Sequence, residues 1–167
     1  MRFNATVEYP GSASQVAELF KDTEFLAFRF AGSHSSDGAH HVSGTAQGGF
    51  RVEVTRNLPQ AVLPSNVQGF LPTGLTLNVV ESWDGPTKDG SRLGSFSIAV
   101  VGMPATARGT ARLQATSEQA CSLIYEGQVD VSIPLFGSRV EQAVAQAFTD
   151  IVHRERDLAA PRLVHQG

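Results

Sequence analysis

Two charged residues occupy positions where the surrounding sequence is apolar. In the segment that begins at Phe50, every second residue is apolar until Arg56 takes the next position in that phase. In the segment that begins at Leu75, Glu81 takes the equivalent position. Because a buried charge is costly unless it is paired, we expect Arg56 and Glu81 to meet, as a polar anchor inside an apolar pocket or as a salt bridge at its rim. If they anchor a ligand, Arg56→Met should weaken binding of acidic or carbonyl-bearing hydrophobic molecules with little loss of fold.

Histidines gather in one stretch, which raises the question of a metal site. His34, Asp37, His40 and His41 lie close together in the sequence. Adjacent residues of a strand point to opposite faces, and the Ser- and Gly-rich residues before His40 favour a solvated loop. The chain also lacks an HExxH motif and a Gly-rich phosphate loop between a strand and a helix. We therefore expect no metal and no cofactor.

Nucleophilic catalysis finds little support in the sequence. Cys121 is the only cysteine, and it shares its phase with the apolar residues of an alternating segment, which indicates a core residue. No serine stands in a GxSxG motif. Tyr9 and Tyr125 would place hydroxyls at a cavity wall, although a buried tyrosine more often donates to a backbone carbonyl.

The elements that must position these residues follow from hydrophobic periodicity. Alternation at period two predicts strands over 1–9, 75–83, 92–101, 105–116 and 120–133, and a hairpin over 40–58. Two short helices are predicted after the first strand, one starting at a Ser12 to Gln15 capping box and one at Thr23. The proline-rich segment 59–74 reads as a lid or packed connection with one helical turn. Apolar residues at spacings of three and four predict a long helix from Ser138 to about Leu163, with Pro161 near its end.

This order of elements predicts an α+β fold in a single domain over residues 1–167. A curved antiparallel sheet of about seven strands would grip the long C-terminal helix on its concave face. Composition agrees, because 41% of the 167 residues are hydrophobic and 17% are charged. A net charge of −3 makes nucleic acid an unexpected partner. Without a signal-peptide pattern or an apolar run of about 20 residues, we expect a soluble cytoplasmic protein with no integral membrane association.

Several motifs resemble those of a known superfamily. They are the first strand with its end at Pro10, the passage 131–141 from the last strand through Pro and Gly into the closing helix, the Trp83 strand and the segment 56–59. The chain resembles the helix-grip superfamily known as START-like or SRPBCC, which includes the birch-pollen-allergen fold, polyketide cyclases and lipid-transfer domains. More narrowly, it is similar to an actinobacterial family of unknown function within that superfamily. The resemblance implies a cavity for a hydrophobic ligand between helix and sheet.

Small side chains provide an independent indication of space in such a cavity. On one strand the inner face carries Ala107, Gly109 and Ala111, and the helix opposite offers Ala143 and Ala147. This leaves volume unless larger aromatic residues fill it. The candidate ligand-binding residues are Arg56, Glu81, Trp83, Phe96, Ala107, Gly109, Ala111, Tyr125, Val144 and Phe148.

Three functions follow from a cavity of this kind. The first is binding or carrying of a lipid-like or polyketide-like molecule, which needs only shape and one or two polar groups. The second is a polyketide cyclase or aromatase-like enzyme that uses the same cavity to position its substrate and move protons. The third is an interaction domain with a filled core. The lack of an evident acid/base cluster favours binding over catalysis.

Overall fold

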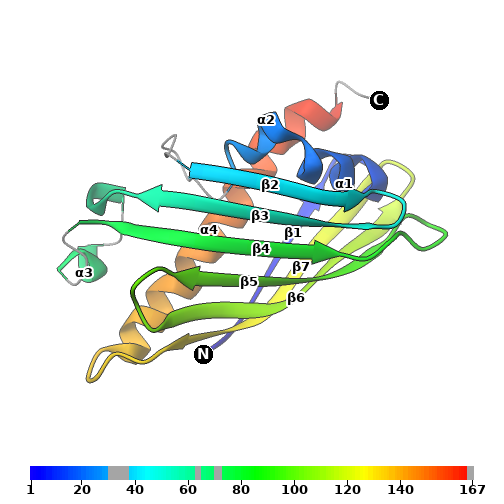
Figure 1. Cartoon of the computed structure of the whole chain (residues 1–167). Helices are drawn as coiled ribbons and strands as arrows, with labels where there is room; N and C mark the ends of the chain where they lie inside the picture. The colour runs from blue at the N-terminus through cyan, green and yellow to red at the C-terminus, as the bar shows by residue number, and fades with distance from the viewer. Residues whose placement is uncertain (30–37, 63–64, 70–72, 165–167) are drawn as a thin grey trace.

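The computed structural model describes residues 1–29, 38–62, 65–69 and 73–164 (Figure 1). Its centre is one seven-stranded antiparallel sheet with the strand order β1-β7-β6-β5-β4-β3-β2. The helix α4 crosses one face of this sheet, so the α+β helix-grip arrangement is confirmed. The elements are β1 (Arg2–Tyr9), α1 (Ala13–Lys21), α2 (Thr23–Leu26), β2 (Gly38–Thr45), β3 (Gly49–Leu58), η1 (Gln60–Val62), α3 (Ser65–Gln68), β4 (Leu75–Trp83), β5 (Arg92–Val100), β6 (Ala105–Ser117), β7 (Ala120–Val131) and α4 (Gly137–Val164).

The buried and exposed residues of the strands alternate as the sequence predicted. In β6 the buried residues Ala105, Ala107, Ala111 and Leu113 share one phase, and the exposed residues share the other. Each strand from β2 to β6 pairs antiparallel with the next one along the chain. Short turns make these connections except between β3 and β4, where the chain runs from residue 59 to 74. The first strand of the chain, β1, pairs antiparallel with the last strand, β7.

Local capping fixes the two helices that follow β1. The Ser12 side chain accepts a hydrogen bond from the Gln15 backbone N at 3.1 Å, and the Gln15 side chain accepts one from the Ser12 backbone N at 2.9 Å. This is the capping box expected from the sequence. The sequence predicted Thr23 as the N-cap of α2, but Asp22, one residue earlier, is the N-cap. The Asp22 side chain accepts a hydrogen bond from the Glu24 backbone N at 2.8 Å. In the described part of the connection from β3 to β4, the chain forms η1 and α3.

The closing helix α4 turns its apolar stripe toward the sheet. Val140, Phe148 and Val152 are buried, as expected. Leu158 also falls at the spacing of three and four that predicts the stripe, but its side chain is exposed. Pro161 lies inside the last turn, where the missing N–H costs only one backbone hydrogen bond.

A separate observation concerns membranes. None of the helices in the described ranges combines the length and the hydropathy that a membrane span requires.

Candidate functional site

An apolar pocket lies between the first half of α4 and the sheet. Its volume is about 130 Å³. Apart from Thr106, every residue of its wall is aliphatic or aromatic, and most are only half-buried, so the pocket opens toward solvent. The wall consists of Leu58, Leu75, Leu77, Ile98, Val100, Ala105, Thr106, Ala107, Val129, Ala143, Val144, Ala147, Phe148 and Ile151.

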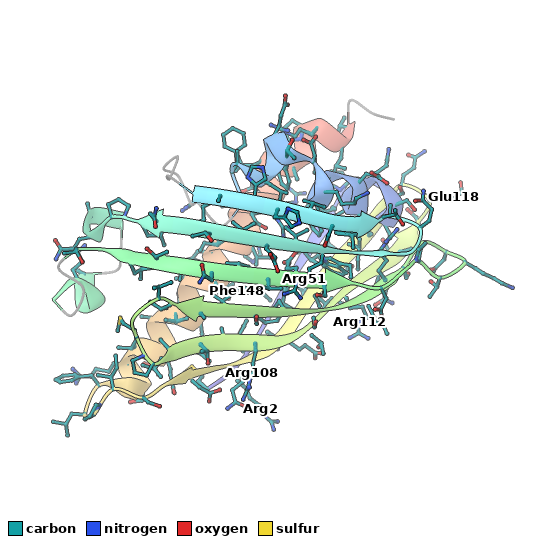
Figure 2. The ribbon with its side chains drawn as sticks, in the orientation of Figure 1. Arg2, Arg51, Arg108, Arg112, Glu118 and Phe148 are labelled. Carbon is teal, nitrogen blue, oxygen red and sulfur yellow. The ribbon has the colours of Figure 1, made fainter. Side chains whose placement is uncertain are left out.

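Small residues on facing elements create this space. Ala143 and Ala147 on α4 share the pocket wall with Ala105 and Ala107 on β6, and these short side chains leave space between the helix and the strand. The space ends at Phe148, whose ring closes the inner end. Figure 2 labels Phe148 where α4 passes behind the sheet.

The inner end is an aromatic floor made of four rings. Phe148 packs against Phe3, Phe96 and Tyr125, with ring centroids 4.9, 5.5 and 5.2 Å away. Gly127 makes room for them, because a Cβ there would lie 2.7 Å from Cζ of Phe96. The space expected beside small residues of the sheet is therefore filled with aromatic rings at this level, and it stays open only nearer the start of β6.

Behind the aromatic floor lies a buried polar network centred on Glu81. Arg29 Nη1 and Nη2 donate to the two carboxylate oxygens of Glu81 at 3.0 and 3.1 Å. The Tyr125 hydroxyl donates to Glu81 Oε1 at 2.6 Å, and Trp83 Nε1 donates to Oε2 at 3.3 Å. The Tyr125 hydroxyl is thus satisfied by a carboxylate rather than by a backbone carbonyl. Such a bidentate, charge-assisted pair is the arrangement in which a buried carboxylate is best compensated.

Arg29 joins this network to α4. Its Nε lies 3.6 Å from Glu155 Oε2, and its guanidinium lies 4.2 Å from the centroid of the Phe20 ring. Burial alone would lower the pKa of Arg29, but the carboxylates of Glu81 and Glu155 raise it overall, so the group stays protonated. Burial, reinforced by Glu81, raises the pKa of Tyr125, so its hydroxyl keeps the proton that it donates.

Arg56 does not pair with Glu81 in the described structure. Its Nε donates to the Arg29 carbonyl at 3.0 Å, its Nη1 to the Thr55 carbonyl at 3.1 Å, and its Nη2 to the Leu26 carbonyl. Arg56 and Glu81 are each only 1% exposed, so the rim interpretation is wrong as well. The expected pair fails because Arg29, in the turn after α2, is the residue that reaches Glu81.

A family model decides where this chain belongs. The model of DUF2505, described as a protein of unknown function, matches residues 4–163. The chain belongs to the DUF2505 family. A search of curated proteins found no match for this DUF2505 chain.

Solved structures resemble the DUF2505 chain in fold. A conserved protein from Geobacillus kaustophilus is 13% identical with a TM-score of 0.59, and the match covers 96% of each chain. A START superfamily protein from Mycobacterium smegmatis is 11% identical with a TM-score of 0.54, over 97% of this chain and 98% of that one. The Zhui aromatase/cyclase from Streptomyces sp. R1128 is 13% identical with a TM-score of 0.50, over 96% and 97%. These likenesses confirm the START-like fold that the motifs implied.

The residues singled out from the sequence of this DUF2505 protein fall into two layers. Ala107, Val144 and Phe148 line the pocket. The others lie at or behind the aromatic floor or beside it in the sheet, outside the pocket wall, and they are Arg56, Glu81, Trp83, Phe96, Gly109, Ala111 and Tyr125. Their role in ligand binding stays a prediction.

Sequence reasoning missed two charged members of the network, Arg29 and Glu155. Glu155 had a usable signal, because it stands seven residues after Phe148 and three after Val152, on the buried stripe of α4. Arg29 had none, since it lies in a turn after α2, where no periodicity fixes the direction of a side chain.

The other candidate chemical groups are spread over the fold. His40 and His41 are exposed on the edge strand β2, and His34 and Asp37 lie outside the described residues. Within the described ranges, no three His, Cys, Asp or Glu side chains are grouped so that they could hold a metal ion. Cys121 is fully buried, and burial raises the pKa of its thiol to about 12, which suits a core residue better than a nucleophile.

The contacts of Arg56 predict a structural cost for its removal. Arg56→Met should lower the free energy of unfolding by about 2–4 kcal/mol, because the carbonyl oxygens of Leu26, Arg29 and Thr55 lose a charged donor inside the protein. Chemical denaturation of the variant measures this loss. A change below about 1 kcal/mol would restore the original expectation of little effect on the fold.

Proposed function

We propose that this protein binds a hydrophobic small molecule in the pocket between α4 and the sheet. The observation that carries the proposal is the apolar wall of the pocket, to which Thr106 contributes the one polar side chain among the described residues. A closed apolar cavity of about 150 Å³ is large enough for benzene. The pocket, at about 130 Å³, therefore suits one ring or a short alkyl segment, with the rest of a longer ligand lying at the open mouth.

Recognition in this pocket would rest on shape rather than on charge. The wall carries no titratable side chain, and Glu81 lies behind the Phe148 floor. A lipid-like or polyketide-like molecule would place its apolar part inside and its polar groups toward water, where they keep their hydration. The cytoplasmic location and the single-domain organisation stay predictions.

Catalysis is the second candidate, and the likeness to an aromatase/cyclase is what favours it. The buried acid/base groups Glu81 and Tyr125 lie behind Phe148, because Tyr125 packs against Phe148 and donates to Glu81. Glu81 already accepts hydrogen bonds from Arg29, Trp83 and Tyr125, and the raised pKa of Tyr125 keeps its hydroxyl protonated. A carboxylate with its lone pairs occupied and a phenol that resists ionisation are poor general bases, so binding is the better supported function.

Melting the protein with small apolar probes tests the proposal. Benzene, indole, octanoic acid and dodecanoic acid are the probes, and each is scanned from low to saturating concentration. A probe present at about 100 times its Kd should stabilise the native state by about 2.7 kcal/mol, or about 5–11 °C for a chain of this size. Ala147→Leu fills the pocket and should abolish the shift.

Gln142→Leu is the matched control for that variant. It adds the same side chain to an exposed position of α4 and should leave the shift intact. If no probe shifts the melt and Ala147→Leu stabilises the protein, the pocket is an unused void and the chain is better regarded as an interaction domain. Turnover of an aromatic polyketide that is lost in Tyr125→Phe would favour the cyclase-like function.

A further inference from the structure

Two neighbouring turns carry exposed apolar side chains. Val101 lies in the turn from β5 to β6, and Leu135 and Phe136 lie in the connection from β7 to α4. The two turns are joined by a hydrogen bond from the Ser132 backbone N to the Pro104 carbonyl at 2.9 Å. Both stand at the end of the molecule where α4 begins (Figure 1). We call Val101, Leu135 and Phe136 the apolar tip.

Leu135 is the most unusual residue of the apolar tip. Its φ is 68°, the one positive value among the described residues other than glycine, and its side chain is 96% exposed. A left-handed backbone is unfavourable for a leucine, and this side chain recovers almost nothing by burial within the chain. Backbone strain of this kind is concentrated at functional sites. An exposed leucine in a strained turn therefore suits contact with an apolar surface outside the protein.

The charges near the apolar tip differ from those of the whole chain. Residues 101–104 and 132–138 contain no charged side chain, and exposed Arg139 follows them at the start of α4. The acidic residues nearest along the chain are engaged elsewhere. Asp130 accepts from the Gln128 side chain at 2.6 Å, and Glu141 lies 3.5 Å from the N-terminal ammonium. The tip thus offers apolar groups and a cation on a protein whose net charge is −3.

The apolar tip is continuous with the mouth of the pocket. Val100 and Ala105 line the pocket and flank the turn that carries Val101. On α4, Ala143 lines the pocket seven residues after Phe136. Apolar surface therefore runs from the tip into the pocket.

We propose that the apolar tip inserts into the surface of a bilayer that contains anionic lipids. Apolar side chains on two narrow turns can enter the acyl boundary, while a neighbouring arginine stays among the head groups. The passage of a ligand between bilayer and pocket rests on the proposed function, but the membrane contact itself does not.

Vesicle flotation tests the proposal. The vesicles are phosphatidylcholine alone and phosphatidylcholine with one quarter phosphatidylglycerol. The unmodified protein should float with the anionic vesicles, and Leu135→Asn should lower its partition coefficient at least tenfold. The melting temperature of Leu135→Asn should not fall, because asparagine accepts a left-handed backbone better than leucine does. Arg139→Ser should weaken binding to the anionic vesicles and leave the weaker binding to phosphatidylcholine unchanged.

Leu93→Asn is the matched control for the leucine. Leu93 is 61% exposed on β5, and its replacement should leave flotation unchanged. The proposal is overturned if the unmodified protein floats with neither vesicle, if Leu135→Asn floats equally well, or if Leu93→Asn loses binding to the same extent. The first result would direct the search toward a protein partner for the tip.

The two proposals fail separately. Ala147→Leu should lose the probe-induced melting shift and still float, and Leu135→Asn should keep the shift and no longer float. If the unmodified protein floats but no probe shifts its melt, the membrane contact stands and ligand binding in the pocket fails. If probes bind but the protein does not float, the pocket stands and the membrane contact fails.

Discussion

Arg29→Met should lower the free energy of unfolding by about 3–5 kcal/mol. The substitution keeps an unbranched apolar stem but leaves Glu81 and Glu155 inside the protein without the cation that lies between them. Removing one member of a buried ionic group costs this much because the remaining charges stay away from water. For a chain of this size, the melting temperature should fall by about 6–20 °C. Thermal and urea denaturation provide the measurement.

Arg51→Met is the control for Arg29→Met. Arg51 pairs with Glu53 at 2.8 Å, but both side chains are about half exposed, so the loss should stay below about 1 kcal/mol. Replacing Arg29, Glu81 and Glu155 together by methionine should recover part of the lost stability, because the two carboxylates are then no longer buried without a cation, while Tyr125 and Trp83 lose their acceptor. Equal effects of Arg29→Met and Arg51→Met would contradict the buried network.

Phe148→Ala should cost about 3–5 kcal/mol and enlarge the pocket. The side chain is nearly fully buried against Phe3, Phe96 and Tyr125, so its removal loses both transfer free energy and ring contacts. The enlarged pocket should accept naphthalene as well as benzene, which melting with each compound would show. Phe28→Ala is the control, because that ring is exposed and its loss should cost under about 1 kcal/mol.

A near-native melting midpoint for Phe148→Ala would show that the ring lines an open void instead of closing the pocket. Such a result would also place the Tyr125 hydroxyl and Glu81 within reach of a bound ligand. The cyclase-like function would then become the stronger candidate.

The fold was predictable because its signals are local. Alternation in a segment such as Ala105–Ser117 follows from a sheet with one buried face, and the spacing of Val140, Phe148 and Val152 follows from a helix lying on that face. The antiparallel pairing of β2 with β3, and of β4 to β7 in succession, follows from turns too short for crossovers, whereas the 16-residue connection between β3 and β4 leaves their pairing open. Errors arose at the ends of elements. At the start of α2, for example, Asp22 caps the helix where Thr23 was predicted, because both residue types are good N-caps.

The site was only partly predictable because side-chain partners are set by tertiary distances. The alternation of the strands correctly predicted that Arg56 and Glu81 are buried. It could not show that Arg29, which lies in a turn, binds Glu81 while Arg56 binds backbone carbonyls. Small residues indicated space, and Ala107 and Val144 do line the pocket. Whether a large ring fills such space depends on its rotamer, and that is why Phe96 and Phe148 close off the region beside Gly109 and Gly127.

The pairing of β1 with β7 determines the order in which the sheet can be completed during synthesis. Glu8 and Ser122, which pair across these strands, are 114 residues apart. At 5–20 residues per second, β1 waits about 6–23 s on the ribosome before its partner exists. Meanwhile β2 to β6 can form successive hairpins, so β1 joins the sheet last, with the apolar residues Ala5 and Val7 exposed until then. Chaperones that hold short apolar segments would find their target in this strand rather than in the later hairpins.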